Sequence, residues 1–306
     1  MIEVVAAVIR DQQGRILITR RPQHVHQGGL WEFPGGKREV EETAWQALSR
    51  ELKEEVDIDV VEAVPLIKID HDYGDKHVLL DVWNVSAFKG EAWGREGQEW
   101  RWIDENTLND YAFPAANQPI IKALRLPAFY ALLEGDSPEQ VWQRYQHLQA
   151  QGIYFLQIRL KNLDAVQRQQ VLKRLQAETA LKQCWLINSD IADASFPAAG
   201  LHLTAQALCA LSERPQGYQW VAASCHSLLE LQHAERLNLD FAVLSPVQIT
   251  TTHPHAQVLG WDVIEPLLRT VKIPVYLMGG LKREDLSKAR ERGAQGLAGI
   301  TTFLDQ

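Results

Sequence analysis

Acidic side chains recur at regular spacing in residues 35–58, the part of the chain best suited to chemistry. The segment reads GGKREVEETAWQALSRELKEEVDI. A helix over residues 43–56, with about 3.6 residues per turn, would place three carboxylates on one face and three apolar side chains on another. The first group is Glu51, Glu54 and Glu55, and the second is Trp45, Leu48 and Leu52. Clustered carboxylates repel one another, so the pattern favours a divalent cation as their counter-charge, and the alternative is a solvated acidic helix face.

A glycine pair stands in front of this predicted helix. Gly35 and Gly36 follow Pro34, and the Pro-Gly-Gly run predicts a loop without regular structure. Mg²⁺ takes oxygen ligands and prefers one or two carboxylates together with substrate phosphates. The loop and helix therefore predict a site for Mg²⁺, or Mn²⁺, and a diphosphate-containing substrate.

The spacing Gly-x5-Glu-x7-Arg-Glu-Leu-x-Glu-Glu-x-x-Ile, from Gly36 to Ile58, resembles the Nudix box. Nudix hydrolases use this loop–helix–loop to cleave nucleoside diphosphates linked to another group. The chain departs from the family at Asp57, where the family has glycine. This position would cap the helix C-terminus with a left-handed backbone, which Asp tolerates better than most residues.

Further stretches are similar to MutT-type 8-oxo-dGTP pyrophosphohydrolases, over about residues 3–125. They are ITRR at 18–21, EFPGGK at 32–37, WGREGQ at 93–98 and FPAAN at 113–117. The resemblance implies Mg²⁺-dependent hydrolysis of 8-oxo-dGTP to 8-oxo-dGMP and pyrophosphate, which protects the nucleotide pool. Metal ions would neutralise charge on the phosphates and activate a water, whose proton a glutamate would accept.

The same resemblance implies the metal ligands. The Gly35 carbonyl and the carboxylates of Glu54, Glu55 and Glu96 would bind the ion, while Glu51 would be either a ligand or the general base. Family members differ in which glutamate deprotonates the water, so the catalytic role stays shared between Glu51 and Glu54.

Other implied roles concern the substrate. Arg50 would orient the box carboxylates by charge-assisted hydrogen bonds, and Arg21 and Lys37 would hold phosphate oxygens. Phe33 and Tyr73 would border the base, and both could equally be core residues.

Asn117 is the specificity residue that the resemblance implies, because one amide can both donate to and accept from a purine edge. The alternative is that Asn117 caps the helix that follows it.

The length of 306 residues suggests two domains, with boundaries at 1–126 and 127–306, because the helical pattern stops at Pro127. In the first domain we expect strands at 4–9 and 16–21, paired through a hairpin turn at 11–14. Further strands at 60–69, 77–85 and 99–103 and a helix at 118–126 predict a mixed α/β sandwich of the Nudix type.

The second domain alternates strands and helices in a regular order, which predicts a closed (β/α)₈ barrel, a TIM barrel. The expected strands are 129–133, 154–159, 184–188, 200–203, 219–224, 241–245, 275–278 and 296–300. The expected helices are 137–151, 164–180, 227–236, 261–270 and 283–292.

Polar residues at the strand ends resemble the thiamin phosphate synthase and TenI family over about residues 128–306. They are Gln157, Arg159, Lys161, Asn188, Ser224, His226, Ser245, Thr250, Thr252, Gly279, Gly280 and residues 299–301. The glycines would form a phosphate cradle for a thiazole phosphate-like ligand.

The barrel departs from the synthases where they carry Mg²⁺-binding acidic residues. Ser189 and residues 204–207 stand there, which argues against a pyrophosphate-dependent synthase. The TenI branch, similar to thiazole tautomerases, uses a histidine at the position of His226 instead. His226 would then be a proton shuttle, and the alternative is a hydrogen-bonded histidine without catalysis.

The composition limits the partners and the cellular compartment that we expect for this protein. The formal charge of -8 argues against broad nucleic-acid binding, and the chain has no run of apolar residues that would span a membrane. Cys184, Cys209 and Cys225 form no metal-ligand spacing, which favours free thiols in a reducing cytoplasm. The amino terminus lacks the pattern of a secretory signal.

Two alternatives remain open at this point. Because the partner domain resembles thiamin enzymes, the first domain could hydrolyse a thiamin-pathway diphosphate. The barrel could also be a phosphate-ligand binding module without turnover.

Overall fold

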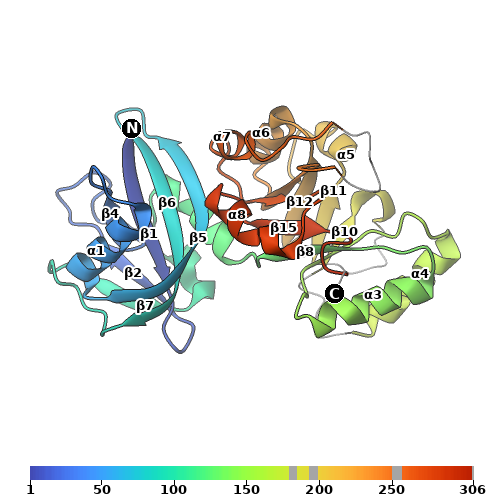
Figure 1. The fold of residues 1–306 in the computed structure, drawn as a ribbon, viewed down its shortest axis with the longest axis horizontal. Helices are drawn as coiled ribbons and strands as arrows, with labels where there is room; N and C mark the ends of the chain where they lie inside the picture. Colours follow the sequence, from blue (N-terminus) through green and yellow to red (C-terminus); the bar gives the residue numbers. More distant parts are fainter. Residues whose placement is uncertain (179–184, 193–198, 250–256, 305–306) are drawn as a thin grey trace. The chain divides into compact units, whose positions relative to one another are not determined.

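The computed structural model describes residues 1–178, 185–192, 199–249 and 257–304. The chain divides into two compact units, Met1–Arg125 and Leu126–Gln306 (Figure 1). Cys184, Thr250, Thr252 and the end of the predicted helix at 164–180 lie outside the described residues.

The first unit contains two sheets and two α-helices (Figure 1). One sheet has the strand order β4-β1-β6-β5 and the other β3-β2-β7. The strands are β1 (Ile2–Ile9), β2 (Ile16–Arg20), β3 (Trp31–Glu32), β4 (Gly35–Lys37), β5 (Asp59–Asp72), β6 (His77–Lys89) and β7 (Trp100–Ile103). The helices are α1 (Ala44–Val56), α2 (Gln118–Leu124) and the short 3₁₀ helices η1 (Glu105–Asp110) and η2 (Ala115–Asn117).

Strand β1 separates two hydrophobic cores because successive side chains of a strand point to opposite faces. Val5, Ala7 and Ile9 pack with buried residues of α1, whereas Ala6 and Val8 pack with buried residues of α2. The predicted mixed α/β sandwich of the Nudix type is thereby confirmed.

Helix α1 begins and ends with specific caps. The Thr43 side chain accepts a hydrogen bond from the Gln46 amide, and the Gln46 side chain returns to the Thr43 backbone, a reciprocal pair that satisfies free helix amides. At the other end, Asp57 adopts φ 56° and ψ 31°, the predicted left-handed conformation. Leu48 and Leu52 are fully buried as predicted, while Trp45 remains 37% exposed.

Two local predictions need correction. The hairpin turn at 11–14 forms, since the Asp11 amide donates to the Arg15 carbonyl at 3.0 Å and Arg10 bridges Ile16, but β1 and β2 do not pair beyond it and belong to different sheets. The glycine pair is also not irregular, because Gly35–Lys37 forms strand β4 against β1. A Cβ on Gly35 would stand 2.1 Å from the Val5 carbonyl oxygen, so glycine permits this close pairing.

The second unit is a closed barrel of eight parallel strands, as predicted, in the order β8-β9-β10-β11-β12-β13-β14-β15 around the barrel (Figure 1). The strands are β8 (Phe129–Leu133), β9 (Leu156–Ile158), β10 (Trp185–Asn188), β11 (Gly200–Leu203), β12 (Trp220–Cys225), β13 (Phe241–Leu244), β14 (Val275–Leu277) and β15 (Gly296–Gly299).

The helices of this unit follow the predicted alternation. They are α3 (Pro138–Ala150), α4 (Ala165–Gln176), α5 (Ala205–Cys209), α6 (Leu228–Arg236), α7 (Ile264–Leu268) and α8 (Leu286–Glu291), with 3₁₀ helices η4 (Ser189–Ile191) and η5 (Arg283–Asp285). Helix α5 was not predicted, because five residues contain too little periodicity to reveal a helix.

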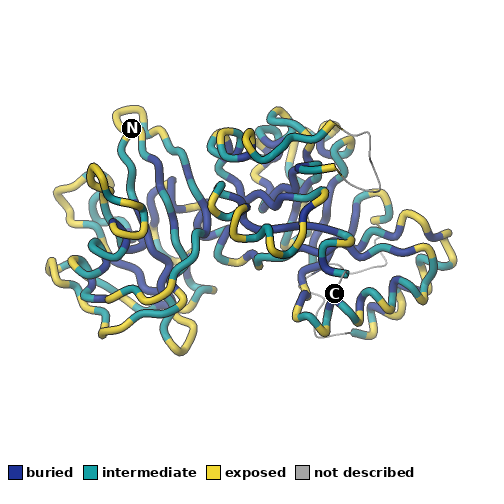
Figure 2. Tube along the Cα trace, viewed as in Figure 1, coloured by how far each residue is buried: buried dark blue, intermediate teal, exposed yellow. Residues whose placement is uncertain are grey.

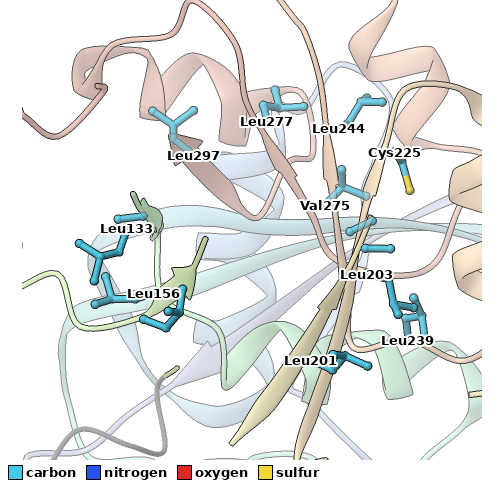
Figure 3. Close-up of a cluster of buried hydrophobic side chains, with 14 of the residues drawn as sticks. Leu133, Leu156, Leu201, Leu203, Cys225, Leu239, Leu244, Val275, Leu277 and Leu297 are labelled. Carbon is cyan, nitrogen blue, oxygen red and sulfur yellow. The ribbon is translucent and has the colours of Figure 1, made fainter. Parts of the chain in front are cut away.

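Alternation along the barrel strands produces an inner and an outer hydrophobic layer. Tyr130 and Leu132 of β8 lie in one buried cluster, whereas Ala131 and Leu133 lie in the other. Figure 3 shows side chains of the second cluster, including Leu133, from several strands. In both units the buried parts of the trace follow the strands (Figure 2).

No helix among the described residues is long and apolar enough to cross a membrane.

Candidate active site

Arg50 is the centre of the charged network on α1. Its guanidinium donates to Glu42 at 2.7 Å, to Glu51 at 2.9 Å and to Glu54 at 3.2 Å, and also to the Lys37 carbonyl at 3.1 Å. Hydrogen bonding to Arg50 is the main reason that the pKa of Glu42 falls to about 2. The network keeps Glu42 ionised and fixes the orientation of the other two carboxylates.

Gly36 makes room for one of these carboxylates. A Cβ at this position would stand 2.1 Å from an oxygen of Glu51, so any side chain would displace that carboxylate. Burial raises the pKa of Glu51, although hydrogen bonding to Arg50 acts in the opposite direction. Strand β4 and helix α1 are thus fitted to each other at this point.

Glu55 points to the other glycine. Its carboxylate accepts a hydrogen bond from the Gly35 amide at 2.8 Å. Burial raises the pKa of Glu55 to about 7, and the negative charges of Glu32 and Glu96 add to this increase. Burial is thus the main reason that the charged form of Glu55 is disfavoured, and the neighbouring carboxylates contribute less.

The predicted metal ligands come from three segments. Gly35 lies on β4, three glutamates lie on α1, and Glu96 lies in the exposed loop before β7. Among the described residues, no three His, Cys, Asp or Glu side chains are arranged so that they could hold a metal ion. Here Glu51 and Glu54 pair with Arg50, whereas Glu55 pairs with Gly35. The donors are all oxygen atoms and the site carries excess negative charge, so its chemistry fits a hard divalent cation.

Arg21 lies directly after β2 and is paired with Glu32 of β3. Its Nε also donates to the His26 carbonyl at 3.1 Å. Burial raises the pKa of Glu32 despite this ion pair, and the charge of Glu96 contributes. Sequence reasoning missed Glu32, although it stands in the EFPGGK motif that carried the resemblance.

Asn117 lies at the first turn of α2 but makes no capping hydrogen bond through its side chain. The capping alternative for Asn117 is therefore wrong. The residue is only 7% exposed, and its amide oxygen has no hydrogen-bond partner in the described structure. A buried amide oxygen without a partner is costly, and this oxygen can still accept a hydrogen bond from a donor outside the chain.

The two aromatic candidates differ in their surroundings. Phe33 is buried in the core and stacks on Phe113, with ring centroids 5.4 Å apart, which favours its core alternative. Tyr73 is hydrogen-bonded to the backbone of Ala116, beside Asn117, and burial raises its pKa. Lys37 is exposed at the end of β4.

In the barrel, the predicted ligand residues lie at the carboxyl ends of strands. Arg159 follows β9 and pairs with Glu134, which follows β8, at 2.5 Å. Lys161 is exposed, whereas Asn188 is buried and accepts a hydrogen bond from the Asp190 amide at 3.0 Å. The partner of Arg159 was not predicted.

His226 follows β12, and its Nδ1 lies 2.8 Å from the Ser245 carbonyl. Since a carbonyl only accepts, Nδ1 carries the proton and Nε2 is the basic nitrogen of the neutral ring. Ser189, at a position where the synthases have an acidic residue, instead accepts a hydrogen bond from the Thr204 amide at 3.1 Å.

Gly279 and Gly280 lie after β14 with φ of 102° and 68°. A Cβ on Gly279 would stand 2.8 Å from Pro246, and one on Gly280 would stand 2.5 Å from the Ile249 carbonyl oxygen. The pair is therefore required for the close approach of the loop after β13.

A buried polar network inside the barrel was also missed. His202 of β11 is fully buried, with Nδ1 3.1 Å from the Tyr130 hydroxyl and Nε2 2.9 Å from the Ser224 hydroxyl. Burial lowers the pKa of His202 to about 3, so the ring is neutral. Its three members come from strands far apart in sequence, which spacing alone does not connect.

Comparisons with known proteins match the two units separately. Residues 5–123 match the NUDIX domain model, and residues 130–303 match the thiamine monophosphate synthase model. An 8-oxo-dGTP diphosphatase of Escherichia coli (strain K12) is 40% identical over 124 residues, which are 40% of this chain and 96% of the relative. A CTP pyrophosphohydrolase of the same organism is 37% identical over 123 residues, 40% of this chain and 90% of the relative.

The barrel has its own relative. A provisionally assigned thiamine-phosphate synthase 2 of Aquifex aeolicus (strain VF5) is 33% identical over 187 residues, 60% of this chain and 100% of the relative. The chain therefore belongs to the Nudix hydrolase family through its first unit and to the thiamine monophosphate synthase/TenI family through its second.

Proposed function

We propose that the first unit hydrolyses 8-oxo-dGTP to 8-oxo-dGMP and pyrophosphate in the presence of Mg²⁺. The observation that carries this proposal is Asn117, buried at the start of α2 with an amide oxygen that lacks a partner in the described structure. Such an amide would favour a base that donates a hydrogen bond to the amide oxygen and accepts one from the amide nitrogen.

Gly35, Glu55 and Glu96 would hold the ion, joined by Glu54 and by Glu51 where the latter is not the base. When bound, Mg²⁺ would neutralise charge on the phosphate chain and acidify water. Glu51 or Glu54 accepts a proton from the attacking water, and Arg50 keeps both carboxylates oriented. Arg21 and Lys37 bind phosphate oxygens as point contacts.

A kinetic panel tests the proposal. We expect kcat/KM for 8-oxo-dGTP to exceed that for dGTP, CTP and thiamin-pathway diphosphates. CTP belongs in the panel because a CTP pyrophosphohydrolase is among the relatives, and the thiamin-pathway compounds because of the fused barrel. A higher value for a thiamin-pathway diphosphate would favour that alternative substrate class.

Asn117→Ala in the same panel tests the specificity residue. Without the amide we expect the ratio of kcat/KM for 8-oxo-dGTP over dGTP to fall about tenfold, while hydrolysis of dGTP continues. An unchanged ratio would remove Asn117 from base selection.

For the barrel we propose a phosphate-containing, thiazole phosphate-like ligand at Arg159, Lys161, Asn188 and the Gly279–280 loop, with His226 as the proton shuttle. The Nδ1–H···O bond to Ser245 supports this role, since it leaves Nε2 basic. Calorimetric titration of the full chain with thiazole phosphate, followed by a tautomerase assay of His226→Asn, distinguishes the readings. Binding with turnover that His226→Asn abolishes supports the enzyme, binding alone supports the binding module, and no binding contradicts both.

A further inference from the structure

Arg20 is the last residue of strand β2 and Arg21 follows it, and each arginine is held in the same manner. Arg20 pairs with Glu99 at 3.0 Å and donates through Nε to the Gly29 carbonyl at 3.1 Å. Arg21 pairs with Glu32 and donates through Nε to the His26 carbonyl at 3.1 Å. Both carbonyls belong to the loop between β2 and β3, so the two arginines are held alike, although Glu99 also accepts from Arg101 at 2.5 Å.

The pairs differ in burial. The Arg20 and Glu99 side chains are 44% and 39% exposed, whereas those of Arg21 and Glu32 are 27% and 23% exposed. Exposed ion pairs contribute little to stability because water and salt screen them. A partly buried carboxylate depends more on its partner, because an unpaired buried charge is costly. We therefore expect the loss of Glu32 to disturb Arg21 more than the loss of Glu99 disturbs Arg20.

The Arg21–Glu32 pair interacts electrostatically with both halves of the candidate site. On one side, Glu32 interacts electrostatically with Glu55 and Glu96, two of the proposed metal ligands. On the other side, both members of the pair interact electrostatically with Tyr73, which is hydrogen-bonded to the backbone beside Asn117. In the proposed function, Arg21 is the member of this pair that binds phosphate oxygens.

We infer that Glu32 is a positioning residue for nucleotide hydrolysis: its carboxylate holds one edge of the Arg21 guanidinium so that the remaining N–H groups face the phosphates. A guanidinium has five N–H donors in a fixed fork, and here one edge binds Glu32 and Nε binds the loop. The long side chain would otherwise lose conformational freedom when the substrate binds, and Glu32 removes that cost beforehand. This inference rests on the proposed function of the first unit.

Glu32→Gln tests the inference, with Glu99→Gln as the matched control. The amide has nearly the shape of the carboxylate, so folding should persist, which circular dichroism checks. Because phosphate binding is shared by ground state and transition state, we expect KM for 8-oxo-dGTP to rise about tenfold and kcat to change less than threefold. Glu99→Gln should leave both constants within twofold of the unsubstituted enzyme.

The Arg21→Ala background separates positioning from a direct role. There Glu32→Gln should have no further effect on KM, because Glu32 acts through the missing guanidinium. An equal increase of KM in both backgrounds would overturn the inference, as would a KM that stays constant or decreases in Glu32→Gln alone. A decrease would mean that Glu32 competes with the phosphates for Arg21.

A second readout does not depend on the base of the substrate. Titration of the full chain with pyrophosphate and Mg²⁺ measures the affinity for pyrophosphate. We expect this affinity to be lower in Glu32→Gln than in Glu99→Gln. The loss should be confined to the part of the affinity that Arg21→Ala also removes. If no nucleotide in the panel is hydrolysed, the proposed function fails, and this titration still decides the role of Glu32. Equal pyrophosphate affinity in the two glutamine variants would contradict the inference.

Discussion

At the scale of residues, one guanidinium serves several carboxylates on α1. Arg50 contacts Glu42, Glu51 and Glu54, which leaves Glu55 to the Gly35 amide. Glu42 accepts from two Arg50 nitrogens and from the Glu39 amide, whereas Glu51 and Glu54 each accept from one Arg50 nitrogen. The pKa of Glu42 is lowered by its hydrogen bonds, whereas burial raises the pKa of Glu51 and of Glu55. Such separation is what a site needs if some carboxylates bind a cation and another accepts a proton.

Glu51→Gln and Glu54→Gln should each reduce kcat by at least about a hundredfold, because either change removes a proton acceptor or a metal ligand. The free energy of unfolding should change little, since glutamine has nearly the shape of glutamate and keeps an oxygen that can accept from Arg50 at both positions. Steady-state kinetics at saturating Mg²⁺ measure the effect. Glu105→Gln, which breaks the pair of Glu105 with Arg10, is the control with an ion pair outside the site. Full activity in either box variant would contradict the site.

Spacing within α1 was enough to predict the acidic face and the position of Arg50. It did not reveal Glu32 or His202, because their partners Arg21, Tyr130 and Ser224 come from other strands. Contacts within one helix follow from its period, whereas contacts between strands depend on sheet order and register.

At the scale of elements, α1 ends where the sequence predicts, at a residue other than the family glycine. The left-handed φ of 56° has a conformational cost at Asp57, and the Asp57 carboxylate contacts Lys53 at 3.0 Å. Strand β4 was mispredicted because its pairing with β1 depends on a residue distant in sequence, and a Pro-Gly-Gly run normally indicates a loop.

Asp57→Gly and Asp57→Ala separate the effect of the left-handed backbone from the effect of the contact with Lys53. Both substitutions lose the contact with Lys53, but only alanine is strained in the left-handed conformation. We expect Asp57→Ala to be less stable than Asp57→Gly by about 1 kcal/mol. Hydrogen exchange of the amides in α1 measures this difference. Equal protection in the two variants would show that the left-handed cap does not limit the stability of α1.

The His202 network predicts a pH dependence of barrel stability. The pKa of His202 is about 3 in the folded protein against 6.5 in the unfolded chain, so only the unfolded state gains a proton between these values. The contribution of a neutral His202 is complete above pH 6.5 and is lost as the pH falls toward 3. The stability advantage of the unsubstituted protein over His202→Gln should therefore shrink by about 1 kcal/mol between pH 7 and pH 5.5.

Hydrogen exchange of amides in β11 and β12, compared at the two pH values, measures this advantage for the barrel alone. An advantage that stays constant with pH would mean that His202 has the same pKa in the folded and the unfolded protein, contrary to this prediction.

At the scale of the whole molecule, the chain combines two family folds, each with its own cores and its own candidate site. The second unit begins with residues that are bonded into the barrel: the Leu126 carbonyl accepts from Gln295 at 2.9 Å and the Pro127 carbonyl from Tyr276 at 2.6 Å. The fold of both units could be predicted because motif spacing and βα alternation are long-range patterns. The barrel's ligand was less predictable, because its strand-end residues depart from the synthases at Ser189 and residues 204–207.

The proposed hydrolysis requires that glutamates beside the Gly35–Lys37 strand hold a divalent ion with which water cleaves a phosphoanhydride bond. The most direct test follows the release of pyrophosphate from 8-oxo-dGTP by the full chain. Mg²⁺ is first titrated in and is then removed with EDTA. We predict that pyrophosphate and 8-oxo-dGMP form in equal amounts, that the rate saturates with Mg²⁺, and that EDTA stops it. Release that continues at the same rate after EDTA, or no release at any Mg²⁺ concentration, would contradict the account.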